Sequence, residues 1–238
     1  MSHHALLTAE DHRALRIRTD ADAALGDAQM ASIVMPAEFR QLQNEYPILF
    51  RLNDQRDRFT ALALFGFEAG ENLYLTPDGW DARHRPLAMA VQPFLIGGGP
   101  DGTGDRQVHI DLASPRIGAG EGMRVFDEDG RPTPYLEQIA ERLGALDQGY
   151  RDSAAFFVAL ERHGLLEPFT LEVTMDDGAI NRLVGFHTID EGRLAALDAA
   201  ALAELNAADH LLPIFMAVAS LANLGALIAR KNRRIAGD

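Results

Sequence analysis

The sequence predicts an α+β fold, in which a mostly antiparallel sheet from the N-terminal half is packed by helices from the C-terminal half. Two observations predict it. Apolar or alternating runs that are typical of strands dominate the first half, and helical periodicity dominates the second half. Strands and helices that are segregated along the chain favour α+β over a wound sheet, in which they would alternate.

Strand-like segments account for most of the first half. Residues 59–67 are strongly apolar and predict a central strand, and residues 106–112 alternate, which predicts a half-buried strand. Residues 86–96 contain two prolines, so we expect extended, edge-like structure there. Shorter strands are predicted at residues 32–35 and 46–50.

The second half contains one hairpin among helices. Asp177-Gly178 lies between two β-rich runs and predicts a tight reversal joining residues 169–175 to 180–188. Helices are predicted at residues 133–146, 152–163, 191–197, 199–206 and 211–234.

The chain has 238 residues and a formal net charge of −13. Residues 1–30 show little periodicity, so we expect a weakly ordered N-terminal arm, followed by a single domain at residues 31–238. The strong negative charge disfavours nucleic-acid binding, because phosphate backbones would be repelled.

The absence of cysteine excludes thiolate nucleophiles, disulfides and cysteine-ligated metals. The sequence does not open with the basic residues and long apolar run that are typical of a signal peptide, which favours a cytoplasmic location. We expect no cofactor.

The uncharged segment from Leu211 to Ala229 has two interpretations. Its length is close to that of a membrane span, and a basic cluster follows it. Pro213, Asn223 and Gly225 interrupt the run, so a buried helix or a helix in a homo-oligomer interface is favoured over membrane association.

Standard catalytic signatures are missing: the sequence has no His-Glu-x-x-His and no Gly-x-Ser-x-Gly. The glycine run at residues 97–104 is not followed by Lys-Ser/Thr, so it predicts a mobile loop and not a P-loop. His109 and Asp111 lie two apart on a predicted strand and share a face, which is one half of a facial metal site. A hydrogen-bonded structural histidine is the favoured interpretation of His109.

Aromatic residues concentrate in the first half, among them Tyr46 and Trp80. Core packing is the first interpretation of this cluster, and a ligand cleft beside the Gly/Pro loops is the second. The candidate ligand-binding residues are therefore Tyr46, Trp80, His109 and Asp111.

Several segments together resemble the SapC family. The resemblance spans roughly residues 30–230, departs from the family pattern at residues 87–92 and at His109, and is carried by Tyr46-Pro47-Ile48-Leu49-Phe50, Leu64-Phe65-Gly66-Phe67, Gly70-Glu71-Asn72-Leu73, Gly79-Trp80, Pro93-Phe94, Ile110-Asp111, Ser114, Leu165-Leu166-Glu167-Pro168, Gly185-Phe186-His187-Thr188-Ile189-Asp190-Glu191 and Ser220-Leu221-Ala222-Asn223-Leu224.

The resemblance implies a bacterial accessory role connected with surface-layer proteins, peptide transport or nutrient handling. It also implies neighbours such as TonB-dependent receptors and flavin-dependent tryptophan halogenase-like proteins. We therefore expect a non-catalytic binding protein whose ligand is a peptide, a protein or a small molecule. The alternative is a metal-dependent, oxygenase-like enzyme or a partner of a halogenase.

Overall fold

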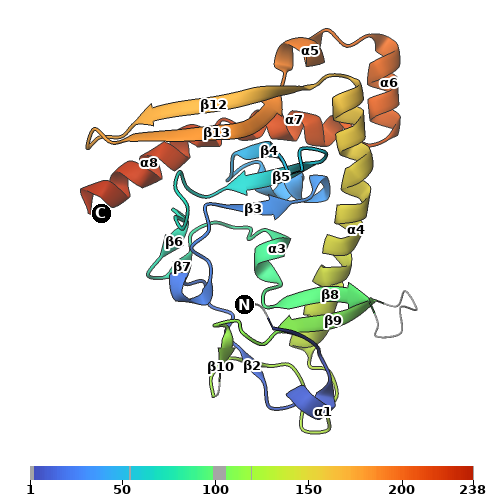
Figure 1. Cartoon of the computed structure of the whole chain (residues 1–238), viewed down its shortest axis with the longest axis vertical. Coiled ribbons are helices and arrows are strands. Elements are labelled where there is room, and N and C mark those ends of the chain that lie inside the picture. Colours follow the sequence, from blue (N-terminus) through green and yellow to red (C-terminus); the bar gives the residue numbers. More distant parts are fainter. Residues whose placement is uncertain (1–2, 54, 99–105, 119, 238) are drawn as a thin grey trace. The chain divides into compact units, whose positions relative to one another are not determined.

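The computed structural model describes residues 3–53, 55–98, 106–118 and 120–237 (Figure 1). It confirms the α+β class, and every named strand pairing in it is antiparallel. The chain divides into two compact units. Unit 1 comprises residues 1–28, 75–80 and 87–148, and unit 2 comprises residues 29–74, 81–86 and 149–238.

The N-terminal residues contribute short elements to unit 1. They are β1 (His4–Leu6), α1 (Ala9–His12), β2 (Arg16–Ile17) and η1 (Ala23–Leu25). Strand β1 pairs with β9, and the side chain of Thr8 caps α1 by accepting the Asp11 N–H. The boundary that the sequence predicts after residue 30 stays a prediction.

Three small sheets form the strand content of unit 1. They have the orders β1-β9-β8, β10-β2-β11 and β6-β7. Their remaining strands are β6 (Leu75–Thr76), β7 (Gly79–Trp80), β8 (Phe94–Gly98), β9 (Arg106–Asp111), β10 (Ile117–Gly118) and β11 (Met123–Arg124). The core of unit 1 is formed by buried apolar residues from these sheets, from the loops between them and from residues 136–143, which are helical. They are Ile17, Val91, Phe94, Ile110, Val125, Phe126, Leu136, Ile139 and Leu143.

The expectation of extended structure throughout residues 86–96 is wrong. Helix α3 (Leu87–Ala90) comes first, and β8 begins only at Phe94. Pro86 directly precedes the helix, where a residue without an N–H costs nothing, because the first helical N–H groups have no intrahelical acceptor. The predicted glycine loop at 97–104 begins inside β8, and its residues 99–104 lie outside the described residues.

Unit 2 is built on one five-stranded sheet with the order β12-β13-β4-β5-β3. Its strands are β3 (Ala31–Val34), β4 (Ile48–Leu52), β5 (Phe59–Leu64), β12 (Leu166–Thr174) and β13 (Ile180–Ile189). Its short helical segments are η2 (Pro36–Glu38), α2 (Phe39–Leu42), α5 (Glu191–Ala195) and α6 (Ala199–Ala207). The apolar run at 59–67 thus supplies an internal strand, as predicted.

The predicted hairpin is confirmed as β12 and β13. The Met175 N–H donates to the Ala179 carbonyl, and Gly178 adopts a φ of 85° at the turn. A residue with a side chain is strained at this φ, which explains why the turn carries glycine.

The two helices predicted at residues 133–146 and 152–163 are one continuous helix, α4 (Pro134–Arg162). The intervening residues contain no proline, and Gly149 lies against Met35. A Cβ at position 149 would be 3.0 Å from the Cβ and Cγ of Met35, so the glycine allows this helix to pack closely.

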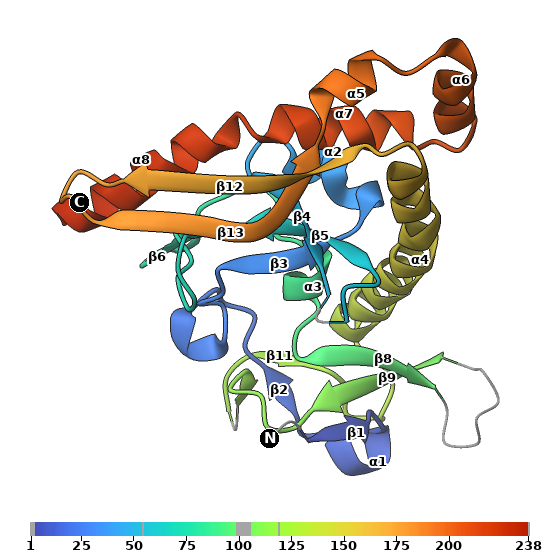
Figure 2. The same ribbon diagram turned by 45° about the horizontal axis from the view of Figure 1, so that its top comes forward.

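Residues 211–236 form α7 (Leu211–Ser220) and α8 (Asn223–Ala236) rather than one regular helix. Leu221 and Ala222 join them in a tightened turn with i→i+3 hydrogen bonds. Figure 2 shows α8 continuing the course of α7 alongside the β12–β13 hairpin. By length and composition alone this stretch could cross a membrane, and 28% of its most apolar window is buried.

Candidate functional site

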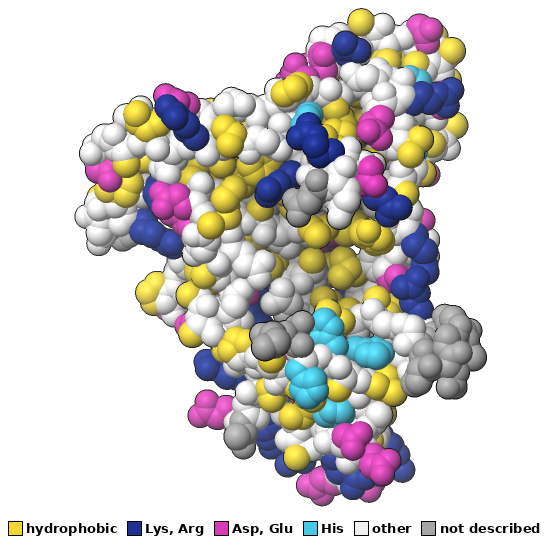
Figure 3. Space-filling view, viewed as in Figure 1, with side chains coloured by type: hydrophobic (Ala, Val, Ile, Leu, Met, Phe, Trp, Pro, Cys, Tyr) yellow, Lys and Arg dark blue, Asp and Glu magenta, His cyan; other side chains and the backbone are white. Residues whose placement is uncertain are grey.

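A solvent-exposed cavity with a largely apolar lining lies beside β3 in unit 2 and is called the β3 groove. It has a volume of about 420 Å³ and is bounded by β3, β5, the chain leading into β5 and the second half of α4. Hydrophobic side chains gather at the surface where β3 and β5 approach α4 (Figure 3). The lining of the groove includes Ile33, Arg58, Phe59, Tyr150, Val158 and Glu161.

Three of these side chains are unusually exposed for their type. Ile33 is 43% exposed, Tyr150 53% and Val158 63%. Phe157 forms the buried floor and packs edge-on against Phe50 of the sheet, with ring centroids 6.0 Å apart. An apolar surface that is concave and open to solvent is typical of a binding site.

Strand β3 is the last strand of its sheet, so among the described residues only one of its edges is paired, with β5. The Phe65 N–H donates to the Met30 carbonyl, and the Leu64 N–H donates to the Pro47 carbonyl on the β4 side. Since these directions alternate along an antiparallel strand, the backbone groups of Ala31 and Ile33 point away from β5. An added strand could pair with them.

Tyr46, the predicted ligand-binding residue in unit 2, is fully buried. Its ring packs against Phe65 and Tyr74 at centroid distances of 5.3 and 4.7 Å, and its hydroxyl donates to the His84 carbonyl at 2.6 Å. Tyr46 is therefore a core residue, in agreement with the first interpretation of the aromatic cluster. Trp80 lies in β7 of unit 1, half-buried and opposite Leu75.

His109 and Asp111 both lie in β9 of unit 1. The His109 ring lies across Gly97 of β8, where a Cβ would be 2.7 Å from His109 Nε2. Asp111 accepts hydrogen bonds from the N–H groups of His3 and Ala113, which lower the pKa of its carboxyl. The carboxylate therefore serves to hold the N-terminal strand and the turn after β9.

Histidine side chains gather on the visible face of unit 1 (Figure 3). Within the described ranges, however, His, Asp and Glu side chains form no group of three or more that could hold a metal ion. The lining of the β3 groove includes none of Tyr46, Trp80, His109 and Asp111. Ligand binding by these four residues stays a prediction.

A second cavity of about 420 Å³ in unit 2 has a mixed lining, in which Arg40, Asp152, Asp209 and His210 lie among apolar side chains. Burial lowers the pKa of His210, whose ring packs edge-on against Phe156 at 5.6 Å. Because His210 is kept neutral and held by an aromatic contact, its geometry is that of a packing residue. The β3 groove remains the better candidate.

Some of the segments that carry the resemblance to a known family contact one another within unit 2. Glu71 shows why their spacing matters. Its carboxylate accepts the Phe67 N–H at 2.8 Å and pairs with Lys231 of α8 at 2.5 Å. A Cβ on Gly66 would be 2.8 Å from the Glu71 carbonyl, so only glycine leaves room for this arrangement.

The late Ser220–Leu224 segment fastens the C-terminal helices to the entry of β4. Ser220 Oγ accepts the Ile48 N–H at 2.9 Å, and the Asn223 side chain donates to the carbonyls of Gln43 and Tyr46. These bonds satisfy the Ile48 N–H and two carbonyls in the chain that leads into β4, groups that are buried or partly buried.

Arg230 completes this network on the outside. Its guanidinium lies 4.4 Å from the centroid of the Tyr74 ring and binds Asp81 at 2.6 Å. Burial raises the pKa of Tyr74 to about 12, and its hydroxyl donates to the Glu45 carbonyl. The basic residues Arg230, Lys231 and Arg234 near the C-terminus thus contact their own fold.

A family model described as SapC matches residues 7–227 of the chain. The chain belongs to the SapC family. No curated protein and no solved structure matches it. Glu71, Ser220 and Asn223 of the SapC segments described above bind backbone and side-chain groups within unit 2, and they do not line the β3 groove.

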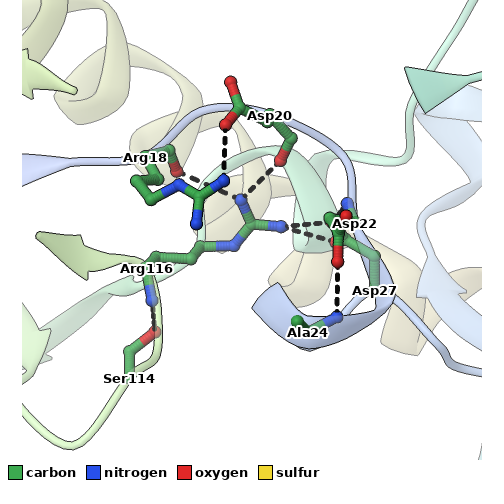
Figure 4. Close-up of polar contacts among 7 residues, drawn as sticks. All are labelled: Arg18, Asp20, Asp22, Ala24, Asp27, Ser114 and Arg116. Atoms are coloured by element: carbon green, nitrogen blue, oxygen red, sulfur yellow. Dashed lines mark hydrogen bonds and ion pairs between the residues drawn. The ribbon is translucent and has the colours of Figure 1, made fainter. Parts of the chain in front are cut away.

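This SapC protein also contains a buried ion pair that the sequence did not reveal (Figure 4). Arg116 and Asp27 of unit 1 are 1% and 0% exposed. Arg116 Nη2 donates to both Asp27 oxygens at 2.6 Å, while Nη1 donates to the carbonyls of Arg18 and Asp20. Through these bonds Arg116, which directly precedes β10, holds the segment between β2 and η1 and also Asp27 after η1.

Sequence reasoning also missed the groove of this SapC protein. Its residues come from β3, the chain before β5, β5 itself and α4, and none belongs to a recognisable motif. The available signal was Val158 on the polar side of the helix predicted at residues 152–163, where a large apolar side chain is unexpected.

Proposed function

We propose that this SapC family member is a non-catalytic accessory protein that binds an extended peptide in the β3 groove. The observation that carries the proposal is an apolar groove beside an open strand edge. The groove volume of about 420 Å³ lies within the range of about 300–1,000 Å³ that is usual for ligand sites.

Extended peptides bind open strand edges because main-chain hydrogen bonds supply affinity and alternate side chains enter pockets. Here the outward backbone groups of Ala31 and Ile33 supply the main-chain hydrogen bonds. The apolar lining around Tyr150 and Val158 supplies the pockets for alternate side chains. Arg58 and Glu161 place opposite charges in the lining, which orients a peptide that carries charged residues.

The resemblance supplies the biological setting of the proposal. In that setting the protein acts in the cytoplasm of a bacterium, in envelope, peptide or nutrient handling. Its partner belongs to a TonB-receptor-linked or halogenase-like system, and the surface-layer connection implied by the family is part of the same proposal.

Binding is tested by fluorescence anisotropy with fluorescein-labelled peptides that carry an aliphatic or aromatic residue at every second position. The Val158→Glu variant places a charge in the groove, and we expect it to weaken binding by at least about tenfold. Val184→Glu on β13 is the matched control, because Val184 is 62% exposed and Val158 is 63% exposed. Its affinity should stay within about twofold of the wild type.

Two results would contradict the proposal. One is a broad panel in which no peptide binds the wild-type protein. The other is an equal loss of affinity in both valine variants, because the peptide would then bind elsewhere.

A further inference from the structure

One face of the α7–α8 stretch is apolar and exposed from Leu212 to Ala229. The exposed positions Leu212, Phe215, Ala219, Ala222, Ala226 and Ala229 recur at spacings of three and four residues. Leu212 and Phe215 are each 51% exposed. Leu221 and Ala222 keep right-handed helical dihedral angles, so the stripe continues through the turn between the two helices.

The opposite face of the same stretch is already committed to the fold. Pro213, Ile214, Ala217, Ser220 and Leu227 are buried. The exposed stripe is therefore a second apolar face, and none of its six positions is needed for the core of unit 2. A contiguous apolar face of this kind marks an interaction surface.

The distribution of size along the stripe is asymmetric and self-complementary. The large side chains Leu212 and Phe215 are at one end, and Ala226 and Ala229 are at the other. If two copies pair antiparallel with Ala219 facing Ala222, Leu212 faces Ala229 and Phe215 faces Ala226 of the second copy. Large side chains then meet small ones in every outer layer, which is the arrangement that fills a helix interface.

Charge follows the same symmetry. Asp209 lies just before the stripe and Arg233 continues it by four residues; both are exposed, and in the described part of the chain neither makes an ion pair. The neighbouring Arg230 and Lys231 are already bound to Asp81, Glu68 and Glu71. Antiparallel pairing brings Arg233 of one copy within one residue of Asp209 of the other, at both ends of the interface.

The geometry points to a two-fold symmetric homodimer of this protein, formed by antiparallel packing of the α7–α8 stripe against a second copy. The interface is isologous, with the same stripe on both subunits. Parallel pairing is disfavoured, because it would put Phe215 against Phe215 and leave alanine against alanine.

The molar mass in solution tests dimer formation. Light scattering after size-exclusion chromatography should give twice the 26.0 kDa of one chain. Ala222→Glu, at the centre of the stripe, should shift the protein to the monomer mass. The matched control is Ala200→Glu, an exposed alanine in α6 outside the stripe, which should remain dimeric. Circular dichroism verifies that both variants are folded.

Introduced thiols test the orientation, and the absence of cysteine in the chain makes their products unambiguous. In the antiparallel dimer, the Leu212→Cys/Ala229→Cys double variant should form a covalent dimer on mild oxidation. Neither single variant should do so, because each introduced thiol would lie about 26 Å along the helix axis from its counterpart.

Three outcomes overturn the proposal. The first is a monomeric wild-type protein at the highest concentration that stays soluble. The second is efficient cross-linking of Leu212→Cys with itself, which indicates parallel pairing. The third is flotation of a monomeric protein with phosphatidylglycerol-containing vesicles that Ala222→Glu abolishes, because the stripe would then contact a membrane.

Discussion

Replacing Arg116 by methionine tests the buried ion pair of unit 1. The substitution keeps much of the side-chain volume and removes the guanidinium, which donates to both Asp27 carboxylate oxygens and to the carbonyls of Arg18 and Asp20. Asp27 stays fully buried, with the Asp22 N–H as a remaining donor at 3.0 Å. A carboxylate out of contact with water would then lack its counter-charge.

The expected loss of folding free energy follows from this geometry. Removing one partner of a buried pair costs about 3–5 kcal/mol, since the other charge is left uncompensated. For a urea dependence of about 1–3 kcal/mol per molar, the unfolding midpoint should fall by at least about 1 M. Arg116→Lys keeps the charge but loses the paired donor geometry, so its cost should be smaller.

Urea unfolding followed by circular dichroism measures these differences. The Arg116→Met/Asp27→Leu variant removes both charges and should be less destabilised than Arg116→Met alone. The reasoning is refuted if Arg116→Met costs less than about 1 kcal/mol, or if the double variant loses the sum of the two single losses, because additive losses mean uncoupled residues.

Two further predictions concern unit 2. Gly66→Ala would place a Cβ 2.8 Å from the Glu71 carbonyl and should cost about 1–3 kcal/mol in urea unfolding, whereas Gly144→Ala, whose Cβ meets no atom within 4 Å, should be neutral or stabilising; equal effects would contradict the close contact. Burial lowers the pKa of His187 and His210, so the unfolded chain binds their protons first and stability should fall as the pH drops below about 6.5. The loss between pH 7.5 and 5.5 should be smaller in the His187→Gln/His210→Gln variant than in the wild type, and an identical loss would show that neither histidine is linked to folding.

Local sequence patterns predicted much of the fold, because strand alternation and turn residues depend on neighbouring residues in the chain. The alternation at residues 106–112 predicts β9, and Asp177-Gly178 predicts the turn between β12 and β13. The segregation of strands and helices also predicts the α+β class. The patterns did not predict that α4 is continuous through Gly149, nor that Met35 packs against this glycine from a distant part of the chain.

The sequence was also sufficient to predict family membership, because the order and spacing of the family segments can be read from the sequence itself. What those segments do was not. Gly66, Glu71 and Lys231 are separated along the chain, and only the folded structure shows that they form one contact.

The sequence by itself determined an acidic, cysteine-free α+β chain of the SapC family. Only tertiary structure decided which apolar side chains remain outside the core. Ile33, Tyr150 and Val158 on the β3 groove, and Leu212 and Phe215 on the α7–α8 stripe, have the same composition as core residues. The hydrophobic effect is non-directional, so it does not specify which apolar side chain is buried. Packing between elements that are distant in the sequence decides which apolar face enters the core.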